Sequence, residues 1–304
     1  MIQISEEKRA AALQVLTPPK NLPPMPEHPA EHYGYLKLAE TETVEMPPVE
    51  GFPWKIYVVR AKNRRERCPI HINVHGGGWV APHRENDDMW SSWLAHQIEG
   101  IVVDVDYTTT QDAAYPVCFD QCYEAAKWTV GNCTQLGGDP RRISMGGYSA
   151  GGHLTALTCL KAAETDDFQL CLQVLGYLPT DLKTPPLYKP EGYDYVISPE
   201  RSAAFNTLLF GNDPELAESP CISPMYAENE VLAKTPRALI ISAGHCNFRF
   251  EDEDYACRLA SLGVETTLKR FPEARHGFIP HLLDGWEDAG KLIAQHIRTA
   301  VLDS

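Results

Sequence analysis

With 304 residues, the chain is long enough for one large α/β domain with a cap or for two smaller domains. Its hydrophobic content of 43% and charged content of 22% are typical of a soluble globular enzyme. The formal net charge of −14 disfavours nucleic acids and anionic membrane surfaces as partners.

The nine cysteines are scattered and include no Cys-x-x-Cys pair, which favours free thiols in a reducing cytoplasm. No stretch approaches the roughly 18 consecutive apolar residues of a membrane-spanning helix. The first residues also lack the apolar core of a signal peptide. We therefore expect a cytoplasmic protein that does not insert into membranes.

The N-terminal residues 1–50 differ in composition from the rest of the chain. Residues 1–20 show the periodicity of an amphipathic helix, and residues 21–50 are rich in proline and acidic side chains. A disordered tail is the alternative interpretation, but Tyr33 and Tyr35 favour burial. We expect residues 1–50 to form an extended arm that packs on the body and contributes to a cap.

Residues 51–304 alternate between short apolar strand patterns and helical patterns. This alternation predicts an α/β fold with a mainly parallel central sheet and helices on both faces. The expected strands are residues 54–59, 70–74, 101–105, 142–146, 170–175, 237–242 and 265–271, and the expected helices include residues 117–130, the stretch after 147–151, and residues 282–301.

An insertion of about residues 180–235 interrupts this rhythm between two expected core strands. It is rich in proline and in aromatic side chains. An aromatic insertion at that position suits a cap over the sheet edge where ligands bind. An elaborated surface loop is the alternative.

The sequence Gly147-Tyr148-Ser149-Ala150-Gly151 lies between an expected strand and an expected helix. A serine flanked at two residues on either side by glycine is the nucleophile-elbow pattern. The sharp turn strains the backbone of the serine, so the side chains two residues before and two residues after it must be minimal. Ser149 is therefore the candidate nucleophile.

The glycine-rich sequence 75–79, His-Gly-Gly-Gly-Trp, directly follows another expected strand. Acyl transfer places negative charge on the carbonyl oxygen, and glycines let backbone N–H groups approach that oxygen closely. Gly77 and Gly78 are the main candidate donors, and the N–H of Ala150 is the third. A phosphate-binding loop is disfavoured, because no lysine follows and the spacing G-x-G-x-x-G is absent.

His276 lies between the last expected strand and the last expected helix. A single histidine is more often structural than catalytic, but its position after the final strand fits the chain order of a serine hydrolase. His276 is therefore the candidate base that takes the Ser149 proton and returns it to the leaving alcohol.

Together, residues 75–79, 147–152 and 276–278 resemble the hormone-sensitive-lipase-like branch of the α/β-hydrolase fold, as does the lead-in at 139–143. The similarity covers roughly residues 55–300. It implies an α/β-hydrolase core with a cap. It also implies cleavage of small carboxylic esters without a metal or a cofactor.

The chain departs from this resemblance at the expected acid, where Cys246 stands in place of an aspartate. A thiol neither orients a histidine strongly nor offsets an imidazolium charge. Glu251 is the first candidate replacement and Asp181 the second, although helix-terminus charge and turn capping explain these two equally well. A Ser–His dyad without an acid, and Cys246 as a nucleophile beside His245, are further alternatives.

The leading hypothesis is a serine hydrolase acting on a small-molecule ester. A catalytically weak or silent binding protein on the same scaffold is the alternative, and an amidase or formamidase would use the same groups. Asp104 and Asp106 have no partners at metal-ligand spacing, so we expect no metal site. The sequence is compatible with a homo-oligomer.

Overall fold

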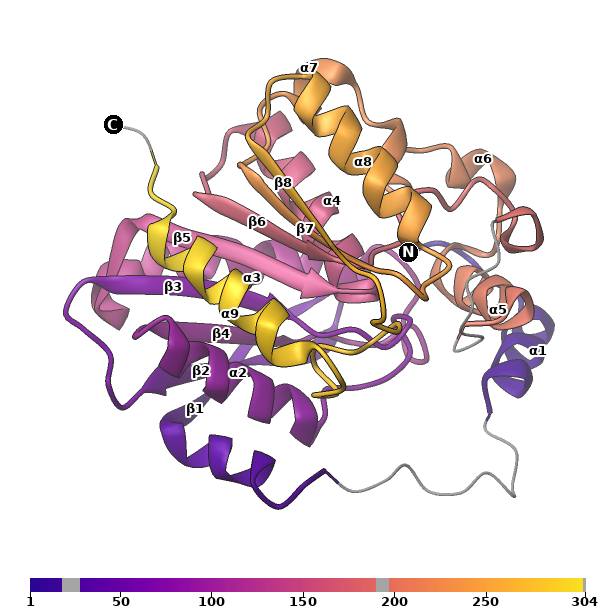
Figure 1. The fold of residues 1–304 in the computed structure, drawn as a ribbon. Helices are drawn as coiled ribbons and strands as arrows, with labels where there is room; N and C mark the ends of the chain where they lie inside the picture. Colours follow the sequence, from indigo (N-terminus) through magenta and orange to yellow (C-terminus); the bar gives the residue numbers. More distant parts are fainter. Residues whose placement is uncertain (18–27, 190–196, 303–304) are drawn as a thin grey trace.

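The computed structural model describes residues 1–17, 28–189 and 197–302. Within these ranges the centre is an eight-stranded sheet with the order β1-β2-β4-β3-β5-β6-β7-β8 (Figure 1). β2 is antiparallel to both of its neighbours, β1 and β4. The six strands β4, β3, β5, β6, β7 and β8, in their order across the sheet, run parallel to one another. The strands are β1 Ala39–Val49, β2 Phe52–Ala61, β3 Cys68–Val74, β4 Ile101–Asp106, β5 Gly138–Tyr148, β6 Leu172–Gly176, β7 Ala238–Ala243 and β8 Thr266–Phe271.

Helices cover both faces of this sheet (Figure 1). On one face, α2 and α9 share a hydrophobic core with side chains of β2 and β4. On the other face lie α3, α4 and α8. The expected mainly parallel α/β fold is thereby confirmed. The α-helices are α1 Glu6–Leu16, α2 Glu85–Gln97, α3 Val117–Leu136, α4 Ala150–Thr165, α5 Pro199–Phe210, α6 Pro214–Ala217, α7 Asn229–Leu232, α8 Arg249–Ser261 and α9 Trp286–Thr299, with 3₁₀ turns at His32–Leu38, Pro186–Tyr188 and Pro224–Tyr226.

The central strands are buried along their length, as every residue of β3, β6 and β7 shows. A parallel sheet covered on both faces produces such continuous apolar runs, which is why these strands are recognisable in the sequence. Their carboxyl ends all lie at one edge of the sheet, and the loops that leave this edge carry the candidate site.

The structure corrects the boundary of the N-terminal arm. Residues 39–49 form the edge strand β1, which pairs with β2 from Ala39↔Ala61 to Met46↔Trp54. These residues belong to the core sheet rather than to an arm. Pro47 and Pro48 misled the sequence interpretation, because proline is tolerated on an edge strand, where an N–H group can be dispensed with.

Helix α2 is not among the elements expected from the sequence. Its first turn is polar, and Asn86 and Asp87 are buried together with its apolar residues. The signal was nevertheless present, because Met89, Trp90, Trp93 and Leu94 recur at a helical spacing and are all buried.

Helix α1 lies beside α5, the longest helix of the insertion between β6 and β7 (Figure 1). Ala12 packs against Ala204 and Leu208 of α5. The side chain of Arg9 also donates a hydrogen bond of 2.9 Å to the carbonyl of Thr110. Residues 18–27 of the expected arm, and Pro190, Tyr193 and Tyr195 of the expected cap, lie outside the described residues.

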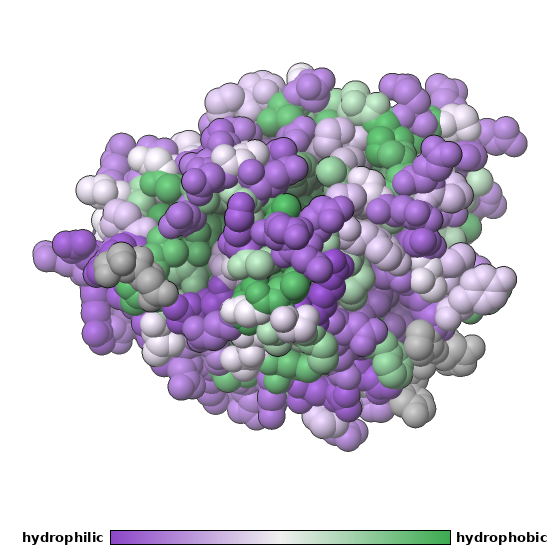
Figure 2. All heavy atoms as spheres, turned by 90° about the horizontal axis from the view of Figure 1, so that it is seen from above, coloured by the Kyte–Doolittle hydropathy of each residue, from purple (hydrophilic) through white to green (hydrophobic). Residues whose placement is uncertain are grey.

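The surface is mainly polar on the face that Figure 2 shows, with apolar side chains in small separate groups. Scattered apolar side chains of this kind are normal and need no partner to explain them. Among the helices of the described ranges, none combines the length and the apolarity needed to cross a bilayer.

An aromatic cluster attaches α9 to the sheet through α2. The Trp286 ring lies 5.0 Å from Trp93 and 5.7 Å from Tyr35, measured between ring centroids, and Trp286 is 5% exposed. We predict that Trp286→Ala lowers the free energy of unfolding by about 3–5 kcal/mol, because it leaves a cavity at this contact.

Urea denaturation of the purified variants measures this effect. Leu283→Ala is the control, because Leu283 is 47% exposed and its truncation should change the free energy by less than about 0.5 kcal/mol. Equal losses in the two variants would show that the cluster does not anchor α9.

Candidate active site

Ser149 occupies a strained turn between β5 and α4. Its backbone has φ 55° and ψ −124°, a conformation that non-glycine residues rarely adopt. A Cβ atom on Gly151 would lie 2.0 Å from the carbonyl oxygen of Val74, and one on Gly147 would lie 2.4 Å from the backbone of Gly151. Both glycines are therefore required by close backbone packing, as the elbow pattern predicts.

His276 is brought to Ser149 by the loop after β8. The Nε2 atom of His276 lies 2.9 Å from Oγ of Ser149. The imidazole stands edge-on to the rings of Tyr177 and Phe248, at centroid distances of 5.0 and 5.6 Å. The two residues proposed from distant parts of the sequence are thus in hydrogen-bond contact at the carboxyl edge of the sheet.

The glycine block 75–79 follows β3 and lies against the elbow. A Cβ atom on Gly76 would be 2.8 Å from the carbonyl oxygen of Tyr148. Gly77 and Gly78 have φ of 117° and 62°, so this path of the chain favours glycine at both positions. A Cβ atom on Gly78 would also collide with the ring of Phe205 in α5 at 2.5 Å. The loop is held between the elbow and the insertion.

The His75 ring helps to orient this loop. Its Nδ1 atom lies 2.8 Å from the carbonyl oxygen of Gly76, so Nδ1 must carry the proton and donate it. In a trans peptide the N–H points away from the C=O, and the N–H of Gly77 therefore faces away from the His75 ring. The hydroxyl of Tyr107 donates to the carbonyl of His75 at 3.2 Å, which holds the preceding peptide as well.

A buried ion pair, which the sequence interpretation missed, lies next to His75 of the glycine block; the rings of His75 and His83 are 5.8 Å apart between centroids. Nε2 of His83 lies 3.1 Å from the Asp104 carboxylate, which also accepts hydrogen bonds from Ser91 at 2.6 Å and Asn73 at 2.9 Å. Burial lowers the pKa of His83, but the Asp104 carboxylate outweighs it and raises that pKa to about 9. Asp104 is thus engaged with a protonated histidine.

The position expected for the acid is occupied by the Cys246 thiol, whose Sγ lies 3.1 Å from Nδ1 of His276. Cys246 is 2% exposed. Its sulfur also receives a hydrogen bond from the backbone N–H of Phe248 at 3.4 Å. At the position where the sequence analysis expects an acid, the structure places the thiol of Cys246 against the imidazole.

The expectation that Glu251 supplies the acid is not met. Its side chain is 11% exposed and forms an ion pair of 2.6 Å with Lys189. The same carboxylate accepts the backbone N–H groups of Thr180 and Asp181, each at 2.8 Å. Glu251 lies in the first turn of α8, and from there its side chain points to the segment after β6 rather than to His276. It anchors that segment instead of orienting the base.

Asp181, the second candidate, caps a turn. Its Oδ1 atom accepts the backbone N–H groups of Lys183 at 2.9 Å and Thr184 at 3.0 Å, and the hydroxyl of Tyr226 at 3.0 Å. Within the described ranges, no carboxylate forms a hydrogen bond or ion pair with His276.

The electrostatics of His276 agree with this geometry. Burial and the neighbouring His281 lower the pKa of His276 to about 3. The imidazole is therefore neutral near pH 7, as a general base must be. Its protonated form, however, gains no stabilisation from a neighbouring anion.

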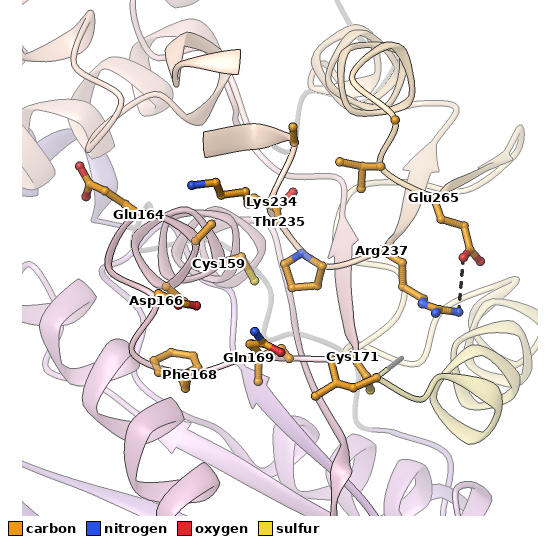
Figure 3. Close-up of a pocket in the computed structure, with 18 of the residues that line it drawn as sticks. Cys159, Glu164, Asp166, Phe168, Gln169, Cys171, Lys234, Thr235, Arg237 and Glu265 are labelled. Carbon is orange, nitrogen blue, oxygen red and sulfur yellow. Dashed lines mark ion pairs between the residues drawn. The ribbon is translucent and has the colours of Figure 1, made fainter. Parts of the chain in front are cut away.

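A separate surface pocket of about 650 Å³ lies away from these residues (Figure 3). Its lining comes from segments that precede β6, β7 and β8, including Cys171, Arg237 and Glu265. Arg237 and Glu265 form an ion pair of 3.4 Å there. Since Ser149, Cys246 and His276 follow the carboxyl ends of strands, this pocket is at the opposite edge of the sheet.

Comparison with known proteins places this geometry in context. Over 280 aligned residues the chain is 29% identical to the carboxylesterase NlhH of Mycobacterium tuberculosis. The aligned region covers 90% of this chain and 82% of that protein. An esterase from the archaeon Pyrobaculum calidifontis has a similar structure, with 29% identity, a TM-score of 0.79, and 98% and 99% of the two chains covered. Carboxyl esterase 2 of the fungus Tuber melanosporum is 26% identical, with a TM-score of 0.79 and 99% and 100% coverage.

A family model described as the alpha/beta hydrolase fold matches residues 71–280, which run from the glycine block to the loop that carries His276. The mainly parallel sheet, the strained turn at Ser149 and this match lead to one assignment: the chain belongs to the α/β-hydrolase family.

Proposed function

We propose that this protein is a serine carboxylesterase that cleaves small carboxylic esters through an acyl-enzyme. The observation that carries the proposal is the 2.9 Å contact between Oγ of Ser149 and Nε2 of His276, directly beside the glycine loop. The similar proteins are named as a carboxylesterase and as esterases, which supports the same class of reaction.

In the proposed reaction, Oγ of Ser149 attacks the ester carbonyl carbon while its proton passes to Nε2 of His276. Negative charge develops on the carbonyl oxygen, and the N–H groups of Gly77, Gly78 and Ala150 stabilise it. The C–O bond to the alcohol then breaks, and His276 gives the proton to the departing alcohol. Water repeats the sequence on the acyl-enzyme, releasing the acid and restoring Ser149.

We further propose that His276 works without a carboxylate partner. A thiol is a weak hydrogen-bond acceptor and carries no charge when protonated, so it stabilises the imidazolium less than an aspartate would. This is the specific observation that favours the second candidate function, a weak or silent binding protein. The intact contact of Ser149 with His276 favours catalysis, and amides as well as esters fit the same groups.

The insertion and α1 are proposed to form the cap. Both lie at the side of the sheet where the glycine loop meets α5, and Phe205 of α5 contacts that loop. The cysteines of the described ranges form no disulfide with one another, which supports a reducing compartment such as the cytoplasm. The small-molecule ester could be bound by a monomer or by a homo-oligomer. Light scattering on the purified protein measures which of the two it forms.

The first prediction concerns the nucleophile. We predict that the protein hydrolyses short-chain p-nitrophenyl esters and that Ser149→Ala reduces turnover to background, because no other hydroxyl contacts His276 in the described ranges. Release of p-nitrophenol over acyl chains from acetyl to octanoyl measures this. Fluorophosphonate labelling of the wild type, absent in the variant, is the independent readout. A wild type that neither turns over esters or amides nor becomes labelled would disprove the proposed function.

The second prediction concerns the acid position. We predict that Cys246→Asp raises kcat, by up to about 10⁴-fold, which is the cost of disabling the acid in the serine-protease template. The backbone N–H of Phe248, which now donates to Sγ, is placed to donate to the new carboxylate. Cys246→Asn is the matched control, because it has a similar shape but no charge and should give no such gain.

The pH dependence of kcat/KM tests the same substitution, and the direction of its shift can be predicted. His276 must be neutral to accept the proton, and its pKa of about 3 sets the acid limb of kcat/KM in the wild type far below the ordinary histidine value. An aspartate beside Nδ1 stabilises the imidazolium and raises this pKa, so the acid limb of Cys246→Asp should move to higher pH. An unchanged limb together with an unchanged kcat would contradict the proposed role of position 246.

The third prediction concerns the cap. We predict that removing residues 1–17 changes the preference among acyl chain lengths more than it changes stability, because α1 supports α5 and α5 contacts Gly78. The ratio of kcat/KM for acetyl and octanoyl esters, measured beside thermal unfolding, tests this. Val15→Asp is the control, since Val15 is 45% exposed on α1. An unchanged ratio in a folded truncated protein would count against a role for α1 in the cap.

A further inference from the structure

Asn247 connects the catalytic histidine to the insertion through a chain of hydrogen bonds. Its Nδ2 atom lies 3.2 Å from the carbonyl oxygen of Ile197. Its Oδ1 atom lies 3.9 Å from Sγ of Cys246, within reach of a weak hydrogen bond from the thiol. Cys246 in turn contacts Nδ1 of His276 at 3.1 Å.

The carbonyl of Ile197 determines which way the Asn247 amide faces. A carbonyl oxygen only accepts hydrogen bonds, so the amide must present its NH₂ group to Ile197. The amide oxygen is then the group that faces Cys246. Since this oxygen is also only an acceptor, the one proton available between the two side chains is that of the Cys246 thiol.

The direction of the thiol S–H group decides whether the sulfur accepts a hydrogen bond from Nδ1 of His276 or donates one to it. When the S–H group points to Asn247, the lone pairs of the sulfur face the backbone N–H of Phe248, at 3.4 Å, and Nδ1 of His276. Phe248 can only donate, which agrees with a sulfur that accepts. Nδ1 of His276 must then carry the proton, and Nε2 is left with the lone pair that accepts the Ser149 proton.

The opposite arrangement would disable the base. When the thiol donates a hydrogen bond to Nδ1, the proton of the neutral imidazole must be on Nε2. Nε2 then faces Ser149 as a hydrogen-bond donor and cannot remove the hydroxyl proton. An aspartate prevents this because a carboxylate has no proton to donate. A thiol can act either way, so a further group must direct it.

We propose that Asn247 is that group. It is a positioning residue that accepts a hydrogen bond from the Cys246 thiol and so holds His276 in the tautomer protonated at Nδ1. The inference rests on the proposed function of Ser149 and His276. Ile197 immediately precedes Ser198, the N-cap of α5, and Phe205 of α5 lies against Gly78. One segment of the insertion, residues 197–205, thus orients the base through Asn247 and supports the oxyanion loop.

The first experiment reads the tautomer directly and needs no activity. ¹⁵N-histidine NMR of the full-length protein near pH 7 distinguishes the protonated from the unprotonated ring nitrogen, and His276→Asn identifies the signals of His276. We expect protonation at Nδ1 in the wild type and a substantial fraction protonated at Nε2 in Asn247→Ala. Asn247→Asp keeps an acceptor oxygen beside the thiol and should retain the Nδ1-protonated form.

The second experiment measures turnover. Asn247→Ala should lower kcat by about tenfold, a small part of the roughly 10⁴-fold loss that follows when a triad holds the wrong tautomer. KM should change little, and Asn247→Asp should recover most of kcat. Asn132→Ala is the matched control, because Asn132 is partly buried and donates to one backbone carbonyl, that of Trp128. It lies near the end of α3 that leads into the start of β5, at the edge of the sheet opposite the site.

A double-mutant cycle separates this role from a merely structural one. In a Cys246→Ala background there is no thiol proton to direct, so Asn247→Ala should have no further effect on kcat. An equal loss in both backgrounds, or an unchanged tautomer and kcat in a folded Asn247→Ala protein, would overturn the proposal. Should Asn247→Ala not fold, the tautomer of Asn247→Asp and of Asn247→Ser decides between the same two outcomes.

The failure of the inference is distinguishable from failure of the proposed function. A wild type that turns over esters while the Asn247 variants keep its tautomer and rate contradicts only the role of Asn247. A wild type without turnover or fluorophosphonate labelling contradicts the esterase assignment, and the wild-type tautomer still tests the hydrogen-bond chain. A resting histidine protonated at Nε2 would refute the chain whatever the activity.

Discussion

The strained turn at Ser149 is the constraint on which the rest of this structure depends. A positive φ at a non-glycine residue costs on the order of 1–3 kcal/mol and persists only where the surroundings enforce it. Here the enforcement is backbone packing, since the elbow lies between the glycine loop after β3 and the end of β6. The backbone N–H of Ser149 donates to the carbonyl of Gly176 at 2.8 Å, so the neighbouring strand holds the turn directly. The fully buried strands β3 and β6, with the buried stretch 143–148 of β5 between them, supply the stability that keeps it in place.

Charge is distributed unevenly around this turn. Next to the glycine block 75–79, Asp104 is paired with a protonated His83, and Glu251 of α8 is paired with Lys189 of the insertion. Both pairs are nearly buried. Removing one partner would leave an unpaired buried charge, so it should lower the stability of the fold by more than the intact pair contributes to it. His276 has no such partner among the described carboxylates, and burial together with the neighbouring His281 lowers its pKa. The buried carboxylates serve the loops that surround the site, and the base itself is left neutral.

The insertion between β6 and β7 joins parts of the site that are distant in sequence. Glu251 and Lys189 attach its first segment to α8, and Asn247 contacts its later segment at Ile197. Phe205 of α5 then fills the space beside Gly78 that any side chain at that position would occupy. A change in the insertion can therefore affect the base and the oxyanion loop together, without any contact with the reacting atoms.

The sequence by itself determined the features that depend on local geometry. The glycines around Ser149 and in the 75–79 loop stand at fixed spacings, and the central strands are continuous apolar runs, so each is legible in the order of amino acids. The segments that require Gly151, Gly76 and Gly78 are nevertheless distant in sequence. The tertiary structure alone decided which groups meet across the sheet. Position 246 contacts His276 because β7 and β8 are adjacent and parallel, whereas Glu251 lies in the first turn of a helix that directs it to the segment after β6. The pairing of β1 with β2, of His83 with Asp104 and of Asn247 with Ile197 likewise depends on where distant segments pack. A linear pattern does not contain those distances, because they are set by strand order and by the burial of whole faces.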